Sequence, residues 1–380
     1  MSELSFIERL LDGVEVESLS MREVCGLITT GKLNANAMDE DGIYPFFTCN
    51  ETPYKINTYA FDLEAILISG NGSQVGHLNY FKGKFNAYQR TYVIGDFCNN
   101  VLVMYLFHYL NYTLKAYITQ NSRKGSVPYI TMPMLENFQI PIPCPENPEK
   151  SLEIQAEIVR ILDAFTAMTA ELTAELNLRK QQYNYYRDQL LSFEEGEVKW
   201  KTLGEVAVIG TGQHDTKDAI EAGDYVFYAR GREPLTLDVY DFDETAIITA
   251  GDGAGVGKVY HYAQGKFALH QRAYRIVPGE HMNPRFVFHY VSSYFYAYIQ
   301  KASVSSSVTS LRRPMFLKFP IPVPELEEQA RIVAILDKFD ALTNSITEGL
   351  PCEIELRQKQ YEYYRDLLLS FPKSNGEAVA

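Results

Sequence analysis

The chain has 380 residues, of which 46% are hydrophobic, so it is long enough for two or three domains with cores of their own. The net charge of −13 excludes a strongly basic nucleic-acid-binding protein, although it leaves room for local phosphate-binding surfaces. No apolar run approaches the ~18–20 residues of a membrane span, and the acidic N-terminus lacks the basic start of a signal peptide. The five cysteines are scattered and never spaced as C-x-x-C, which indicates free thiols in a reducing cytoplasm.

Residues 1–146 are predicted to form a first globular block of mixed α and β structure. A strand pattern leads into a polar, glycine-rich loop in "AILISGNGSQVG" (65–76). Basic, aromatic and amide side chains meet in "KGKFNAYQR" (82–90), and "VLVMYLFHYLNYTLKAYI" (101–118) is typical of a buried helix. The proline-rich "PIPCPE" (141–146) then delivers an extended chain, because a residue before proline avoids the α region.

A single long helix is predicted next, over about 151–193 within the segment 147–196. Its apolar residues recur at steps of three, four or seven, with charged and amide residues between them. At 1.5 Å per residue such a helix is ~65 Å long, too long to bury its apolar stripe on one small block. The residues that we assign to a helix or partner interface on this stripe are Phe165, Leu172, Tyr183, Tyr186, Leu190 and Phe193.

Residues 197–325 are predicted to form a second mixed block. "AIITAG" (246–251), "KVYHYA" (258–263) and "AYRIV" (273–277) have strand-like content, and the loop "GDGAGVG" (251–257) joins the first two. Glycines let a backbone approach phosphate, as in a dinucleotide-binding loop. Such a loop is followed by a helix, however, whereas this one is followed by a strand pattern. We therefore favour a structural turn or a DNA-facing loop over a cofactor cradle.

Residues 326–373 repeat the helical pattern with one difference. The segment "EGLPC" interrupts it, and Gly349 and Pro351 are expected to bend or split the helix there. Two such stripes in one chain most simply bury each other as an antiparallel coiled coil, and 374–380 are expected to be a disordered tail. The interface residues assigned to this second stripe are Phe339, Ile346, Tyr361, Tyr364, Leu368 and Phe371.

The chain is two tandem copies of one unit. "LRKQQYNYYRDQLLSF" (178–193) and "LRQKQYEYYRDLLLSF" (356–371) are identical at twelve of sixteen positions. "EIQAEIVRILDAF" (153–165) matches "EEQARIVAILDKF" (327–339), and the blocks share weaker matches such as "FHYL" with "FHYV". The predicted fold class is α+β, with two pseudo-symmetric globular domains separated by two long helices that form an antiparallel coiled coil.

No active site is legible in this sequence. It has no G-K-[ST] phosphate loop and no H-E-x-x-H motif, and its few histidines belong to no evident nucleophile, base and orienting group. The Asn-Pro pairs at 147–148 and 283–284 lack the Pro-aromatic tail of an amino-methyltransferase motif. We expect neither a catalytic centre nor a metal site in this chain.

Corresponding loops of the two blocks carry residues suited to DNA. Arg and Gln pair bidentately with guanine and adenine edges, whereas Lys suits phosphates. For any one residue a solvated surface charge is the alternative, and the shared Gln-Arg pair is also compatible with a structural device of the fold. The candidates are Asn71, Ser73, Gln74, Lys82, Lys84, Tyr88, Gln89, Arg90, Arg123 and Lys124 in the first block, and Arg230, Arg232, Lys258, Lys266, His270, Gln271, Arg272, Arg312 and Arg313 in the second.

Two divergent blocks, each followed by a near-duplicate "IPxP…QxxIVxILDxF…LRxxQYxYYRDxLLxF" helix, resemble the specificity subunit of a type I restriction–modification enzyme. The resemblance covers essentially the whole chain except the tail "PKSNGEAVA". It implies that 15–145 and 198–325 are target-recognition domains for double-stranded DNA. It also implies that the helices hold these domains apart and dock two modification (methyltransferase) subunits, with restriction (translocase-nuclease) subunits joining that core.

On this resemblance the chain is a non-catalytic, cytoplasmic subunit that recognises a bipartite, asymmetric DNA site. S-adenosylmethionine, ATP and magnesium are then expected in the partner subunits, with no cofactor in this chain and no membrane partner. Two other classes stay open from the residues alone. One is a self-contained DNA methyltransferase or nuclease with degenerate motifs, and the other is a coiled-coil adaptor that binds only proteins.

Overall fold

The computed structural model describes residue 10 and residues 13–122, 128–194, 196–302, 310–345 and 347–371. The chain divides into unit 1, which contains Met1–Leu172 and Ile354–Ala380, and unit 2, which contains Thr173–Glu353. Each unit therefore holds one block, the start of the helix that follows it, and the end of the other helical segment. Arg123, Lys124, Ile346 and the tail 374–380, for which the sequence predicted roles, lie outside the described residues.

Unit 1 is built around a six-stranded sheet in the order β2-β7-β5-β6-β3-β4. All neighbours are antiparallel except β3 and β6, which run parallel. Ile66 and Ile94 pair across β5 and β7 and face the helix α3, whereas the adjacent Leu67 and Val93 pack on the opposite face. This alternation is that of a strand with both faces covered. The strands are β2 (Cys25–Thr30), β3 (Tyr44–Phe47), β4 (Tyr54–Ile56), β5 (Phe61–Ser69), β6 (Leu78–Ala87) and β7 (Thr91–Phe97), and α3 spans Val103–Asn121.

Unit 2 repeats this order in two four-stranded sheets, β10-β17-β14-β15 and β12-β11-β16-β13. The long β5–β6 hairpin of unit 1 is here bent into two pieces at Glu244 and Gly265, which exchange backbone hydrogen bonds of 3.1 Å. Gly265 has a φ of +79°, which glycine adopts without strain. The elements are β10 (Ala207–Thr211), β11 (Tyr225–Tyr228), β12 (Leu235–Leu237), β13 (Phe242–Asp243), β14 (Ala246–Ala250), β15 (Tyr260–Ala263), β16 (Lys266–Leu269), β17 (Ala273–Pro278) and the helix α7 (Pro284–Ala302).

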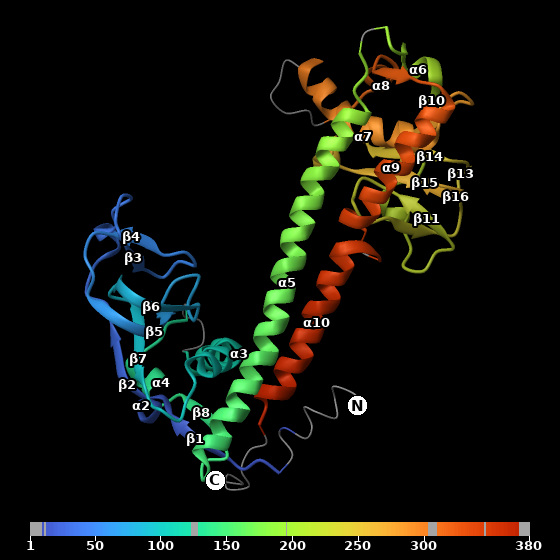
Figure 1. Ribbon diagram of the computed structural model, residues 1–380. Helices are drawn as coiled ribbons and strands as arrows, with labels where there is room; N and C mark the ends of the chain where they lie inside the picture. Colours follow the sequence, from blue (N-terminus) through green and yellow to red (C-terminus); the bar gives the residue numbers. More distant parts are fainter. Residues whose placement is uncertain are drawn as a thin grey trace. The chain divides into compact units, whose positions relative to one another are not determined.

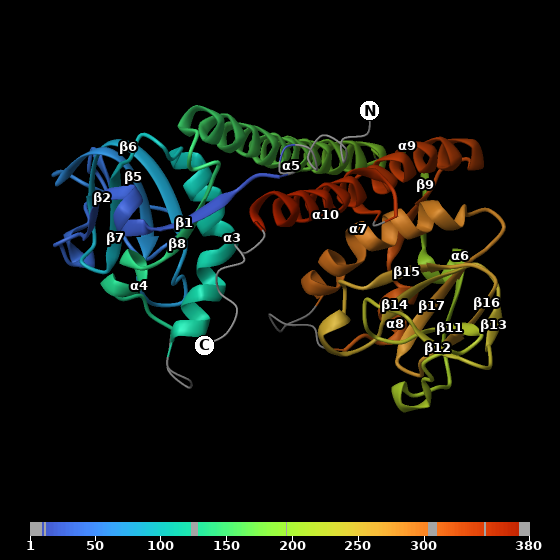
Figure 2. The same cartoon turned by 90° about the horizontal axis from the view of Figure 1, so that it is seen from below.

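Short elements complete both blocks. In each unit a two-stranded sheet ties the start of the block to the proline-rich strand that precedes the long helix. Figure 2 shows α3 and α7, each lying beside the sheet of its own unit. The remaining elements are β1 (Val16–Ser20), α2 (Met21–Val24), η1 (Ala35–Ala37), α4 (Met132–Glu136), β8 (Gln139–Pro143), β9 (Lys199–Thr202), α6 (Leu203–Val206), η2 (Thr216–Asp218), η3 (Gly253–Gly255), α8 (Arg313–Leu317) and β18 (Pro320–Val323).

The first long helix is continuous and the second is split, as the sequence predicted (Figure 1). α5 spans Pro148–Leu190, whereas the second segment consists of α9 (Leu326–Asn344) and α10 (Gly349–Leu369). Gly349 has a φ of +77°, and a Cβ at this position would collide with the carbonyl oxygen of Ala341. Pro351 falls in the first turn of α10, where its missing N–H costs no helical hydrogen bond.

The helices pack in opposite directions. In unit 1 Phe165, in the first half of α5, stacks on Tyr364 near the end of α10, with ring centroids 5.1 Å apart. In unit 2 Tyr186, near the end of α5, stacks on Phe339 of α9 at 5.6 Å. Residue numbers therefore rise along α5 as they fall along its partner. The predicted antiparallel pairing is confirmed.

A buried glutamine fixes each helix to its own block. In unit 1 Gln155 of α5 accepts the N–H of Leu102 at 2.8 Å and donates to the carbonyl of Asn100 at 2.9 Å. In unit 2 Gln329 of α9 makes the same two kinds of contact, to Asn283 at 2.7 Å and to His281 at 3.0 Å. Both glutamine side chains have no exposed surface, so neither amide can exchange these part-buried bonds for bonds to water in the folded chain.

A histidine and an aspartate make a second joint in each unit. His108 of α3 contacts Asp163 of α5 at 2.8 Å, and His289 of α7 contacts Asp337 of α9 at 2.7 Å. Burial lowers the pKa of His289, against the hydrogen bond to Asp337, which raises it. Burial raises the pKa of Asp337, but hydrogen bonds from Arg285 and His289 outweigh this and hold it below its usual value. The repeated "FHY" and "ILDxF" motifs are thus the two halves of one contact.

We predict that Gln329→Ala destabilises the chain by about 1–3 kcal/mol, because it leaves part-buried backbone groups of Asn283 and His281 without their protein partner. Urea unfolding of the full chain measures the loss. Gln358→Ala is the matched control, because Gln358 is an exposed glutamine of α10. Equal stabilities of the two variants would show that the buried amide does not stabilise the joint.

Candidate DNA interface

The loop between β6 and β7 of unit 1 is held by its backbone, which leaves its side chains free to bind. Tyr88 donates its N–H to the carbonyl of Phe47 at 2.9 Å, and Gln89 donates to the carbonyl of Leu33, also at 2.9 Å. The side chains of Gln89 and Arg90 are exposed. Within the described residues Arg90 forms no ion pair, so its guanidinium is available to a ligand.

The equivalent loop of unit 2, between β16 and β17, has the same backbone bonds, with His270 in the place of Tyr88. His270 donates its N–H to the carbonyl of Tyr228 at 3.0 Å, and Gln271 donates to the carbonyl of His214 at 2.8 Å. His270 is buried, and its Nδ1 accepts the N–H of Arg272 at 2.9 Å. Gln271 and Arg272 are exposed like their counterparts. One rigid loop shape is therefore presented twice.

A glycine at each site brings the glycine-rich loop against the Gln-Arg loop. Gly70 donates its N–H to the carbonyl of Arg90 at 2.9 Å, and Gly251 donates to the carbonyl of Arg272 at 2.8 Å. A Cβ on either glycine would collide with that same carbonyl oxygen, so only glycine permits the approach. Each unit thus gathers two of the predicted loops into one site.

The site of unit 1 carries neutral polar groups beside Arg90. The amide oxygen of Asn71 lies 3.2 Å from the thiol of Cys49, and Gln74 donates to Glu51 at 3.1 Å. Ser73 is exposed at the tip of the same loop. A recess of about 350 Å³ adjoins the site, and its lining includes Ala35, Asn36, Met38, Thr48, Cys49, Asn50, Tyr54 and Tyr88.

The site of unit 2 is charged. Asp252 of the glycine-rich loop forms an ion pair with Arg230 through one carboxylate oxygen and with Arg272 through the other, both at 2.9 Å. Burial raises the pKa of Asp252, but the two arginines outweigh it and hold the pKa below its usual value. Burial, and then the charge of Arg230, lowers the pKa of His270, which favours its neutral form.

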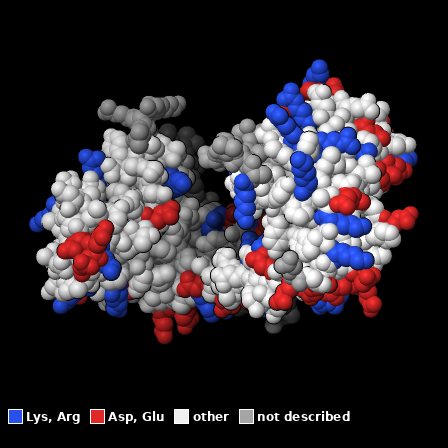
Figure 3. Space-filling model, turned by 90° about the horizontal axis from the view of Figure 1, so that it is seen from above, with Lys and Arg blue, Asp and Glu red and all other residues white. Residues whose placement is uncertain are grey.

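The remaining cationic candidates lie apart from these two loops or at their edge. Lys84 lies over the ring of Tyr59 at 4.6 Å, and Lys266 lies over the ring of Tyr240 at 4.7 Å, so each lysine has a structural contact on its strand. Lys82 pairs with Glu64 of the neighbouring strand at 3.4 Å. The other exposed cationic candidates of unit 2 are Arg232, Lys258, Arg312 and Arg313. Lys and Arg side chains gather on the face of unit 2 seen in Figure 3, with Asp and Glu mostly toward its edge.

The residues assigned to the helical stripe lie largely inside the units. Tyr183, Leu190 and Phe193 pack on the core of unit 2, and Tyr361, Tyr364 and Phe371 pack on the core of unit 1, where Leu368 is fully buried. Phe165 and Phe339 form the ring contacts between helices, and Leu172 is half-buried. The large apolar side chains that stay exposed on the repeated segments are Leu178, Tyr185, Tyr186, Leu356 and Tyr363.

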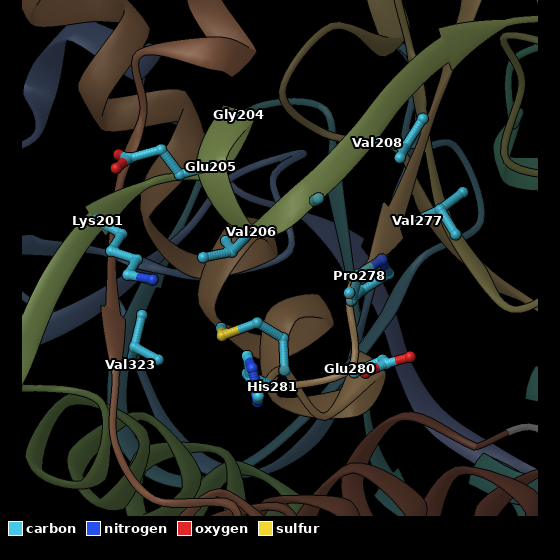
Figure 4. Close-up of a pocket in the computed structure, with 13 residues that line it drawn as sticks. Lys201, Gly204, Glu205, Val206, Val208, Val277, Pro278, Glu280, His281 and Val323 are labelled. Atoms are coloured by element: carbon cyan, nitrogen blue, oxygen red, sulfur yellow. The ribbon is translucent and has the colours of Figure 1, made fainter.

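A second recess, of about 360 Å³, lies in unit 2 where β9, α6 and β18 meet (Figure 4). Part of its polar lining is used in structure, because the carboxylate of Glu205 accepts hydrogen bonds from Thr202 at the start of α6 and the carbonyl of His281 accepts from Gln329. Over the residues that the structure describes there is no cluster of three metal-binding side chains, nor a helix long and apolar enough to cross a membrane.

Comparison with known proteins agrees with the architecture. The family model of the type I restriction modification DNA specificity domain matches residues 13–179 and again 195–356. The specificity subunit of the type I restriction enzyme EcoR124I/EcoR124II from Escherichia coli is 41% identical, over 98% of each chain. The EcoprrI specificity subunit from the same species is 36% identical, over 92% of this chain and 93% of the relative.

Solved structures show the same fold. The S subunit of a type I restriction–modification system from M. genitalium superposes with a TM-score of 0.66 over 96% of this chain and 98% of that structure, at 15% identity. A chain from a type I system solved for its complex assembly and conformational transition gives a TM-score of 0.53 over 93% and 97%. The family model covers both repeats and the relatives span the chain nearly end to end. The chain therefore belongs to the family of type I restriction–modification DNA specificity subunits.

Proposed function

We propose that this chain recognises a bipartite, asymmetric site on double-stranded DNA, with each block reading one half-site through its Gln-Arg and glycine-rich loops. The observation that carries the proposal is that both blocks present a Gln-Arg loop with the same backbone bonds, beside a glycine-rich loop whose side chains differ. Two identical readers would specify a repeated half-site, as the halves of a dimeric repressor do. The glycine-rich loop bonded to Arg90 carries the neutral Asn71 in unit 1, whereas Arg272 pairs with Asp252 in unit 2, so we expect the two half-sites to differ.

We further propose that the repeated helix ends dock two methyltransferase subunits. Leu178 and Tyr185 are seven residues apart on α5, with exposed fractions of 56% and 62%, and their counterparts Leu356 and Tyr363 on α10 have 50% and 52%. Seven residues are close to two turns, so each pair lies on one helix face. The edge of Tyr185 meets Tyr186, and Tyr363 meets Tyr364 in the same way, both at 5.4 Å.

Apolar side chains exposed at matched positions of a duplicated segment fit one kind of partner bound twice. Restriction subunits then join through the methyltransferases in the cytoplasm. S-adenosylmethionine, ATP and magnesium belong to those partners, because methyl transfer and ATP-driven translocation are their reactions. Methyl transfer by the isolated chain would instead favour a self-contained methyltransferase, and a complex that binds DNA without sequence preference would favour a protein-only adaptor.

Arg90→Ala and Arg272→Ala are each expected to impair one half-site only, because the two residues stand in different blocks. A lost base contact should cost about 1–3 kcal/mol of discrimination. Sequencing of methylated DNA from cells that express the whole modification complex gives the effect on each half. Arg160→Ala is the control, since Arg160 is an exposed arginine of α5 paired with Glu157.

Equal effects of the two substitutions on both halves, or no effect, would rule out separate reading by these loops. A uniform loss of affinity with a smaller salt slope would assign the arginines to phosphates instead.

Leu356→Glu and Leu178→Glu should each weaken the binding of one methyltransferase subunit by about tenfold or more, because a carboxylate would be buried in an apolar contact. Size exclusion with light scattering would then show complexes with one methyltransferase fewer. Gln358→Glu places the same charge at an exposed position two residues further on α10 and serves as control. Full assembly of both leucine variants would place the docking surface elsewhere.

One further copy of "TAEL" inserted after Leu176 should widen the gap between the half-sites by about one base pair, or at most two. The insertion lengthens α5 by about 6 Å and rotates it by roughly 40°, which leaves its apolar stripe largely in phase. Base pairs are spaced ~3.4 Å apart. Methylated-site sequencing gives the gap directly, and Glu171→Gln, which leaves the length unchanged, is the control. An active insertion variant with unchanged spacing would show that α5 does not set the distance.

A further inference from the structure

In the site of unit 2, the carboxylate of Asp252 binds two arginines, Arg230 and Arg272. Arg230 follows β11, Asp252 follows β14 and Arg272 follows β16, so three separate segments converge on this site. Each oxygen of Asp252 accepts from one guanidinium at 2.9 Å. The side chain of Asp252 is 20% exposed, whereas those of Arg230 and Arg272 are 41% and 65% exposed. The carboxylate therefore lies deeper than the cations that it holds.

The carboxylate of Asp252 is not needed to hold its own loop. The backbone of that loop is already fixed, because Gly251 bonds to Arg272 and to Leu311 and Asp252 forms a β-bridge with Ser310. The backbone of Arg272 is fixed as well, by the Nδ1 of His270. What remains for the carboxylate is to fix the two long arginine side chains, which otherwise lose much rotamer freedom when they bind.

The equivalent positions of unit 1 do not hold a carboxylate between two arginines. The parallel pairing of β3 with β6 matches that of β11 with β16, which places Cys49 where unit 2 has Arg230. Asn71 occupies the position of Asp252 and contacts only the thiol of Cys49 among the hydrogen bonds of its side chain in the described structure. Arg90 occupies the position of Arg272 without an anionic partner in that same part of the chain.

We propose that Asp252 is a positioning residue that presents Arg230 and Arg272 to a guanine in the half-site read by the second block. The inference rests on the proposed function and specifies its chemistry in one block. The three groups together keep one net positive charge. Guanine offers two acceptors, O6 and N7, at the edge of the major groove, and a guanidinium fixed in one plane matches them bidentately. A lysine or a freely rotating arginine matches them less well.

The test is Asp252→Asn in the full modification complex, read by methylated-site sequencing. The substitution keeps the shape of the side chain and removes the charge that holds both arginines. We expect discrimination at a guanine-containing base pair of the second half-site to fall about ten- to a hundredfold, with the first half-site unchanged. Glu244→Gln is the matched control, because Glu244, between β13 and β14, pairs with Arg275 of β17 at 2.6 Å and contacts neither arginine of the site, so both half-sites should persist.

A double-mutant cycle separates positioning from an independent contact. In an Arg230→Ala, Arg272→Ala background, Asp252→Asn should have little further effect, because nothing is left for the carboxylate to hold. Fully multiplicative effects would mean that Asp252 acts without the arginines and would overturn the proposal. So would an unchanged second half-site, or a loss of affinity that is uniform over all sequences.

Methylated-site sequencing of the wild-type complex separates a failure of the proposed bipartite recognition from a failure of the proposed role of Asp252. If it methylates a single undivided site, or no specific site, the proposed bipartite recognition fails. If it methylates a bipartite site that Asp252→Asn leaves intact, only the role of Asp252 fails. Thermal unfolding and assembly of each variant confirm that a lost half-site is not a lost fold.

Discussion

The buried glutamine that joins each helix to its block is the constraint on which the arrangement of each unit depends. In unit 1 the amide of Gln155 bonds to the two backbone groups of Asn100 and Leu102, just before α3 begins. In unit 2 the amide of Gln329 bonds in the same way to His281 and Asn283, just before α7 begins. An amide needs both partners in fixed directions, so the crossing helix has one orientation on the long helix. The sheet packs on that crossing helix, and the proposed DNA-reading loops end its strands.

Neither copy of the repeat completes a core alone. The core of unit 1 includes Leu368 and Leu369 from the end of the second helical segment, and the core of unit 2 includes Leu191 from just beyond the end of the first. The segment repeated almost without change is thus the part that each copy gives to the other. A single copy would leave this apolar stripe exposed, so duplication within one chain satisfies packing as well as the proposed binding of a partner twice.

The sequence predicted the helices and their pairing. It did not predict the side-chain contacts that depend on which residues of neighbouring strands and loops stand opposite each other. Apolar spacing predicted the continuous α5, the residues Gly349 and Pro351 predicted the break, and the need to bury two apolar stripes predicted the antiparallel pairing. The structural use of Lys84 and Lys266 was not legible, because a cation over a ring of a neighbouring segment follows from strand pairing. The role of Asp252 was not predicted, because sequence patterns indicate DNA contacts by positively charged residues and Asp252 is acidic. Its signal was present, since an acidic residue replaces Asn71 in the other copy.

Neither block carries a large excess of positive charge, and this sets how the chain can bind DNA. In unit 2 one carboxylate already offsets one of two arginines, and the whole chain has a net charge of −13. Non-specific attraction to phosphates is therefore weak, and each block alone gains little from it. Joining two weak readers on one chain makes the second contact intramolecular, which multiplies affinity without new contacts. Two weak blocks on one chain then favour DNA that carries both half-sites over DNA that carries only one.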